Sequence, residues 1–163
     1  MLRKIILPLL VLLAACDDPI VAPPSTGGRP TVEIDDGFQT VTGMVVSERE
    51  LRSYDTGELI PLLGPQTELL RGLIGAEIKI RGSADEFGAT TLWIVEFRVL
   101  WVDGLPAFDG VLAEYDEGFA IETMEGNLEF LPNVPEDLAI HVGKRVWLTT
   151  RDGNCVNYGV LEM

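Results

Sequence analysis

The feature that most constrains the fold of this chain is an internal duplication at an offset of 67 to 69 residues. Residues 42–46 are echoed by residues 109–113, and residues 56–59 by residues 125–128. At a constant offset of 68, Leu70, Ile74, Gly75, Ile78 and Ile80 correspond to Leu138, Val142, Gly143, Val146 and Leu148. Solenoid repeats have periods of about 20–50 residues, which is shorter. The sequence therefore predicts two copies of one small domain.

The first copy is predicted to contain three strands, a short helix and two further strands. The helix begins with Pro65 in its first position, is stopped by Gly75, and carries its apolar residues on one side. The strands are expected at 38–46, 51–54, 58–63, 76–81 and 91–101. The helix side comprises Leu69, Leu70, Leu73 and Ile74.

Strict alternation is expected in the last of these strands, 91–101. It would place Trp93, Val95, Phe97, Val99 and Trp101 on one face. Leu92, Ile94 and Leu100 would then make the second face of this strand apolar as well.

The second copy repeats this order, with strands expected at 111–115, 119–124, 127–131, 145–149 and 155–161. Its helix is expected at 135–142 and ends at Gly143. The predicted fold class is mainly β, with two tandem five-stranded barrels that each hold one short helix. A helix between the third and fourth of five strands resembles the OB-fold. An SH3-like barrel or a two-sheet sandwich also fits this element order.

The two predicted domains, 38–104 and 105–163, are expected to pack against each other. A unit of about 55–65 residues is marginally stable alone, because it buries only about 60% of its unfolded surface. The connection at 102–108 is too short to let the halves separate. Leu92 and Ile94 are the residues expected between the two barrels.

The N-terminus carries a short basic and apolar segment. Arg3 and Lys4 precede an apolar run from Ile5 to Ala15, which Leu13-Ala14-Ala15-Cys16 closes. A transmembrane helix needs about 20 apolar residues, so this run of 11 is typical of a cleaved leader. Residues 1–16 resemble a bacterial lipoprotein signal. That resemblance implies a signal peptide at 1–15 and acyl chains on Cys16 that anchor the protein to a lipid bilayer.

Residues 16–37 are predicted to form a flexible tether after the lipid anchor. This segment is rich in proline, glycine and serine and has few apolar residues to bury. About 20 residues at about 3 Å each would place the domains up to about 60 Å from the membrane. The expected location is the bacterial cell envelope, on the inner or outer membrane, with the domains exposed to the periplasm or the cell surface.

The charge of the chain narrows its partners. The formal net charge is −14, and removal of Arg3 and Lys4 with the leader would make it −16. Nucleic-acid-binding proteins usually carry basic patches, so nucleic acid is not expected as a partner. High solubility, cationic partners and weak divalent-cation binding are all compatible with an acidic surface. An envelope protein is the expected kind of protein partner.

The sequence offers little for catalysis. With Cys16 lipidated, Cys155 has no intramolecular partner, which leaves a buried structural thiol, an intermolecular bridge or a reactive nucleophile. Its surroundings predict the buried thiol, on a strand. His141 is the only histidine, and a dyad of Cys155 with His141 is the alternative enzymatic interpretation. The acidic pairs, such as Asp116-Glu117, fit tight turns better than calcium loops. No catalytic residue, metal site or cofactor is predicted.

The expected function is a non-catalytic binding or assembly module. A thiol-dependent enzyme that uses Cys155 and a periplasmic scaffold without a small ligand are the alternatives. In OB-folds the ligand surface lies on strands two and three and on the adjoining loops. The candidate ligand-binding residues on these regions are Tyr54, Phe87, Tyr115 and Trp147. Each could instead serve packing, and Trp147 is expected to face away from the second core.

Overall fold

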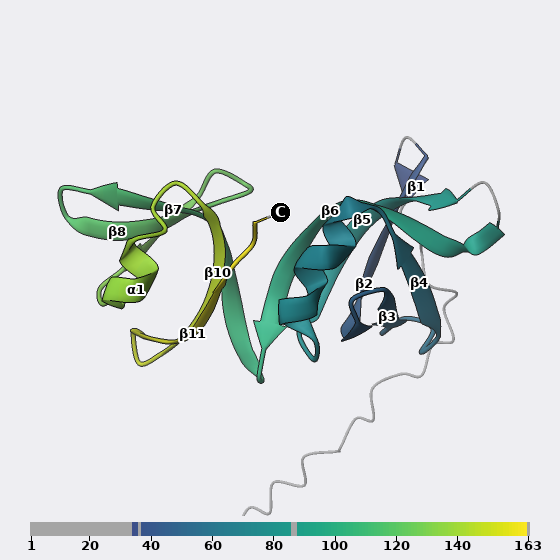
Figure 1. Cartoon of the computed structure of the whole chain (residues 1–163), viewed down its shortest axis with the longest axis horizontal. Helices are drawn as coiled ribbons and strands as arrows, with labels where there is room; N and C mark the ends of the chain where they lie inside the picture. Colours follow the sequence, from purple (N-terminus) through teal and green to yellow (C-terminus); the bar gives the residue numbers. More distant parts are fainter. Residues whose placement is uncertain (1–33, 36, 86–87, 163) are drawn as a thin grey trace, which may run out of the picture.

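The structure is a computed structural model that describes residues 34–35, 37–85 and 88–162, and these residues are mainly β (Figure 1). The signal peptide, Cys16, most of the predicted tether and Phe87 lie outside the described residues. The first half contains β1 (Ile34–Asp35), β2 (Phe38–Ser47), β3 (Glu50–Ser53), β4 (Leu59–Leu63), η1 (Pro65–Leu73), β5 (Glu77–Asp85) and β6 (Gly88–Val102). The second half contains β7 (Leu105–Tyr115), β8 (Gly118–Thr123), β9 (Leu128–Leu131), α1 (Glu136–Ala139), β10 (Arg145–Arg151) and β11 (Asn154–Val160).

Five strands of the first half form a closed barrel. β2 pairs with β3, β3 with β4, β4 with β6 in parallel, β6 with β5, and β5 with β2. The order of three strands, a helix and two strands that the sequence predicts is therefore present. β1 extends the sheet by pairing with the start of β2, so the predicted tether at 16–37 already contains strand structure at its end.

The helix of this half is a 3-10 helix. It has three residues per turn, so Thr67, Leu70 and Leu73 line up on one face, and all three are buried. Ile74 falls outside this line and is 60% exposed, so its predicted place on the apolar side is wrong. Gly75 adopts a left-handed conformation, with φ of 88°, directly after the helix, as its predicted stopping role requires.

β6 does not alternate strictly, because its pairing with β5 shifts register at three places. Arg81 pairs with Glu96 and Gly82 with Ile94, which leaves Val95 without a partner opposite it. Each extra residue reverses which side chains face inward. Leu92 and Ile94 are thus buried in the barrel core, and not between the halves as predicted. The same core contains Phe97 and Val99, whereas Trp93, Val95 and Trp101 are exposed.

The second half is a five-stranded sheet in the order β9-β8-β7-β10-β11. Among the described residues, β9 and β11 do not pair with each other, and a single parallel bridge joins Asn133, which follows β9, to Asn154 of β11. The Asn133 side-chain amide donates a hydrogen bond of 3.0 Å to Asn154. This half has a hydrophobic core of its own, formed by Leu112, Ile121, Leu131, Leu138, Val146 and Leu148.

The two halves each contain an equivalent backbone hydrogen bond. The Gly75 N–H donates to the Val45 carbonyl at 2.8 Å, and the Gly143 N–H donates to the Leu112 carbonyl at 2.7 Å. Gly143 also has a positive φ, of 84°. The two glycines that the sequence aligns are therefore bonded in the same way to the first long strand of their half. Gly143 does not itself end a helix, because α1 already ends at Ala139, so the helix predicted at 135–142 is shorter than expected.

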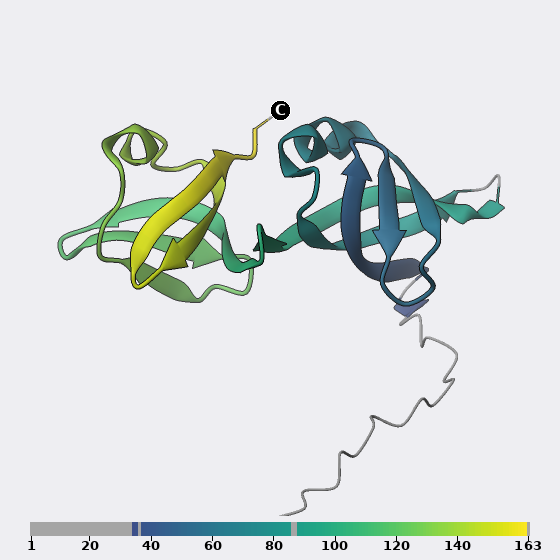
Figure 2. The same cartoon turned by 90° about the horizontal axis from the view of Figure 1, so that it is seen from below.

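β6 and β7 form a continuous hairpin that joins the halves. Trp101 pairs with Pro106 and Val102 with Leu105, so the predicted linker is itself a two-residue turn between strands. Asp103 and Gly104 both have positive φ, of 52° and 74°, as a type I′ turn requires. Figure 2 shows the two sets of strands side by side, with this hairpin running between them.

Beside the hairpin, an ion pair between Asp109 and Arg145 connects the two halves. Asp109 is completely buried and accepts hydrogen bonds from Arg145 Nε at 2.9 Å and Nη2 at 2.8 Å. The same two side chains reach the first half, since Asp109 accepts from the Val99 N–H at 2.7 Å and Arg145 donates to the Phe97 carbonyl. The Arg145 guanidinium also stacks over the Phe97 ring at 4.7 Å.

Candidate interaction surface

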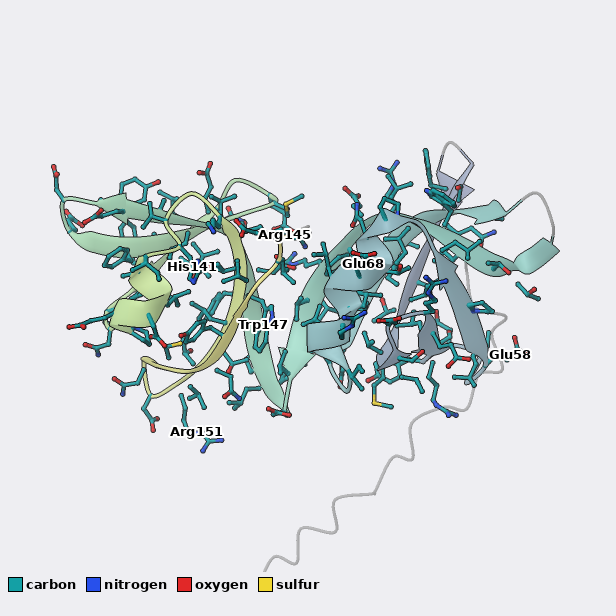
Figure 3. The ribbon with its side chains drawn as sticks, viewed as in Figure 1. Glu58, Glu68, His141, Arg145, Trp147 and Arg151 are labelled. Atoms are coloured by element: carbon teal, nitrogen blue, oxygen red, sulfur yellow. The ribbon has the colours of Figure 1, made fainter. Side chains whose placement is uncertain are left out.

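The four candidate binding residues from the sequence do not form one site. Tyr54 lies after β3 in the first half and is 50% exposed, while Tyr115 ends β7 in the second half and is 40% exposed. Phe87 lies outside the described residues. Trp147 is only 8% exposed and belongs to the hydrophobic cluster of the first half, together with Leu161. It is a contact between the halves and faces away from the second core, so it offers no open platform for a ligand (Figure 3).

Tyr115 has an aromatic neighbour that sequence reasoning missed. Its ring lies 6.0 Å from that of Phe130, measured between centroids, with an interplanar angle of 57°. Strand pairing explains the proximity: Ala113 lies opposite Ala120, and Ala120 lies opposite Phe130. The small alanines leave room for the two aromatic side chains to cover them.

Further apolar side chains continue this surface across the sheet. Val111 lies opposite Glu122, which lies opposite Leu128, so both apolar residues are on the same outer face as the aromatic pair. Val111 is 38% exposed, Leu128 43% and Phe130 55%. We call the surface formed by Val111, Tyr115, Leu128 and Phe130 the apolar face of β7–β9. Contiguous exposed apolar patches of this kind usually mark interaction sites.

The apolar face of β7–β9 lies in the most acidic part of the chain. Between Arg98 and Lys144 the sequence has ten aspartates and glutamates and no lysine or arginine. Several of these carboxylates are exposed on β7–β9 or their turns: Glu114, Asp116, Glu117, Glu122, Glu125 and Glu129. An apolar patch surrounded by negative charge is complementary to a partner protein whose own apolar patch is bordered by positive charge.

Cys155 is half-buried and packs against the second core. Burial raises the pKa of its thiol, and the negative charge of Asp137 raises it further. Asp137 also accepts a hydrogen bond from the Tyr158 hydroxyl. A reactive cysteine needs the opposite, a lowered pKa in a positive environment. These surroundings keep the thiol protonated and do not favour the alternative in which Cys155 is a nucleophile.

His141 lies just after α1, and its Nδ1 is buried without a hydrogen-bond partner in the described part of the chain. Within residues 34–35, 37–85 and 88–162, no three histidine, cysteine or acidic side chains gather to hold a metal ion. The described residues also include no helix long and apolar enough to cross a membrane.

Comparisons with known proteins identify no relative. No family model, no curated protein and no solved structure matches this chain. The interaction surface therefore has to be interpreted from its own geometry and charge.

Proposed function

We propose that this chain is a lipid-anchored protein of the bacterial envelope, held through acyl chains on Cys16, that displays two OB-like barrels as a non-catalytic docking module. The lipobox-like sequence before Cys16 supports the anchor. The strand order β2-β3-β4-β6-β5, with a helix between the third and fourth strands, supports the OB-like assignment of the first half.

The second half supports the same assignment in a more open form. Its strand order β9-β8-β7-β10-β11 corresponds, strand by strand, to β4-β3-β2-β5-β6 of the first half. The Asn133–Asn154 bridge stands where β4 pairs with β6 in the closed barrel. OB-folds are often partly open at this point.

The observation that carries the docking proposal is the apolar face of β7–β9. In an OB-like barrel its position corresponds to the strands and the first loop that commonly bind ligands. The partner we propose is a protein with an apolar patch bordered by lysine and arginine, because such a border would complement the exposed carboxylates. A second copy of this chain fits poorly, since it would oppose the same negative charges.

A site-specific cross-linker tests this docking surface. Phe130 is replaced by a photoreactive benzoylphenylalanine in the envelope-bound protein, and Val156 on β11 serves as the control, because it is 45% exposed in the same half. One discrete adduct from position 130 and none from 156 is expected. The cross-linked protein is then identified and purified for binding measurements.

The purified partner should bind the Phe130→Glu variant at least about tenfold more weakly than the parent, because the variant adds charge to the apolar centre. The Val156→Glu variant should bind as the parent does. Binding should also weaken as salt rises, since the border contacts are electrostatic. Equal affinity of the parent and Phe130→Glu contradicts the docking proposal, and a concentration-dependent homodimer that Phe130→Glu abolishes would identify a second copy as the occupant.

The lipid anchor has its own test. Cys16→Ser removes the thiol that would receive the diacylglycerol, so we expect an unprocessed precursor or a released protein in membrane fractionation. A single acylated residue is the only anchor proposed for the chain. A fully processed variant that still sediments with membranes would contradict it.

A further inference from the structure

A groove lies at the junction of the halves, apart from the apolar face of β7–β9. It has a volume of about 360 Å³. One wall is the outer face of β5 and β6, which carries Lys79, Arg81, Glu96 and Arg98, and the other is the β8–β9 turn with Glu125. The Arg98 side chain forms an ion pair with Glu125 across it. The groove is therefore built from both halves.

Positive charge gathers in this groove although the chain is strongly acidic. Three of the nine lysines and arginines in the described residues line it. Strand pairing places Lys79 directly opposite Arg98. Like charges directly opposite each other on neighbouring strands repel, so this arrangement favours an anion between or above them.

Two cationic side chains in the groove, Lys79 and Arg98, keep hydrogen-bond donors that no protein group accepts in the part of the chain that the structure describes. Glu96 pairs with Arg81 at 3.6 Å and Glu125 pairs with Arg98, each through one carboxylate oxygen, so part of the positive charge in the groove is already balanced. Lys79 forms no ion pair with any side chain that the structure describes. Arg98 Nε likewise has no acceptor within the described chain. A ligand that completes this set has to supply acceptor oxygens.

The charges of the lining also limit the charge of the ligand. Three cations and two carboxylates leave one net positive charge in the groove. A singly charged carboxylate balances it, whereas a doubly charged phosphate would meet added repulsion from Glu96 and Glu125. The volume exceeds that of a carboxylate alone, so the group that carries it can be as large as an amino-acid residue.

We propose that this groove binds the carboxylate of a peptide, with Lys79 as its principal ion-pair partner. The side chain of an acidic residue and a peptide C-terminus offer the same chemistry. The four residues that define the apolar face of β7–β9 do not line the groove, so loss of one binding activity leaves the other measurable.

The test uses the full ¹⁵N-labelled chain in non-ionic detergent, titrated with four probes and followed by NMR. The probes are acetyl-Ala-Ala-Ala with a free C-terminus, the same peptide amidated, acetyl-Ala-Glu-Ala-amide, and inorganic phosphate. Saturable shifts at residues 79–81, 96–98 and 124–126 are expected with the free carboxylate peptide or with the glutamate peptide, and the stronger of the two identifies the source. Equal shifts with the uncharged amidated peptide, or tighter binding of phosphate, would overturn the proposal.

Two variants localise the effect. Lys79→Gln should weaken binding of the carboxylate peptide about tenfold, because it removes a charge-assisted contact. Lys144→Gln is the control, since Lys144 is a partly exposed lysine that pairs with Glu162 outside the groove. Lys79 is exposed on a strand, so its variant should keep the parent spectrum away from the groove. Unchanged affinity in Lys79→Gln, with the fold intact, would refute the assignment.

Discussion

Both halves have a glycine where two of their neighbouring strands approach each other closely. A Cβ atom built on Gly43 would lie 2.2 Å from the Arg52 carbonyl oxygen, and one on Gly110 would lie 2.1 Å from the Glu122 carbonyl oxygen. Gly43 lies in β2 opposite β3, and Gly110 lies in β7 opposite β8. This shared close approach explains why the duplicated segments both keep a glycine there.

Gly110→Ala should therefore destabilise the protein. The added methyl group would force β7 away from β8, and overpacking of this kind typically costs about 1–3 kcal/mol. Gly72→Ala is the matched control, because nothing lies within 4 Å of its Cβ position. It should be neutral or stabilising by up to about 1 kcal/mol. Urea unfolding monitored by circular dichroism measures both, and parent-like stability of Gly110→Ala would contradict the close approach.

The surroundings of Cys155 predict a slow thiol. Burial and the Asp137 charge both disfavour the thiolate, so the pKa of Cys155 is raised and alkylation at neutral pH is retarded. The rate of iodoacetamide labelling rises with the thiolate fraction. Its midpoint should therefore lie at a higher pH for Cys155 than for a free cysteine. Asp137→Asn removes one cause and should move this midpoint to lower pH.

Glu136→Gln is the control for that measurement, because Glu136 is the neighbouring carboxylate and is not among the causes of the shift. A thiol that reacts at neutral pH faster than a free cysteine would instead restore the enzymatic interpretation of Cys155.

Among the secondary-structure elements, β6 needs the most protection at its edge. β4 covers it only at Leu92 and Trp93, and β7 only at its last two residues. Side chains occupy the edge between these points: Gln66 donates to the Val95 carbonyl, Arg145 donates to the Phe97 carbonyl, and Asp109 accepts from the Val99 N–H. Free strand edges promote aggregation, and these contacts satisfy the groups that would otherwise be open.

The order of the elements could be predicted from the sequence because turns and helix stops are local signals. Asp103-Gly104 and Gly143 mark their positions whatever the distant contacts are. Which side chains of β6 face the core could not be predicted from the sequence. The bulges that decide it depend on the pairing with β5, and a strand that is apolar on both faces fits either register.

For the same reason, the interaction surfaces could be predicted only in part from the sequence. Tyr115 could be selected from its loop, but its contact with Phe130 depends on the register of three strands. The groove brings Lys79 and Arg98 to Glu125 from distant parts of the sequence, so no local pattern announces it. Likewise, the Asp109-Gly110 pair has the composition of a tight turn, whereas Asp109 is the buried partner of Arg145 within a strand.

In the whole molecule, the strands of the two halves do not interleave. β1 to β6 pair with one another, β7 to β11 pair with one another, and only the β6–β7 hairpin crosses between the halves. Side chains also connect the halves: Trp147 and Leu161 in the first hydrophobic cluster, the Arg98–Glu125 ion pair, the hydrogen bond from Asn157 to Asp103, and the Asp109–Arg145 pair with its bonds to β6.

We expect these contacts to make the halves one cooperative unit. Urea unfolding of the parent, followed in parallel by tryptophan fluorescence and circular dichroism, should show a single coincident transition. Asp109→Ala should lower the stability by about 3–5 kcal/mol, because it leaves the Arg145 charge and the Val99 N–H without their partner. Such a loss is large beside a total of about 5–15 kcal/mol, so the variant should unfold in two steps or at a much lower urea concentration.

Glu48→Ala provides the matched control for this loss. It removes the ion pair with Arg71, whose side chain is 75% exposed, and exposed pairs contribute only about 0–1 kcal/mol. Because the Asp109 carboxylate is fully buried and serves both halves at once, its removal should act on their coupling as well as on overall stability. Two resolved transitions in the parent would show that the halves unfold independently, and the junction would then be a contact without thermodynamic coupling.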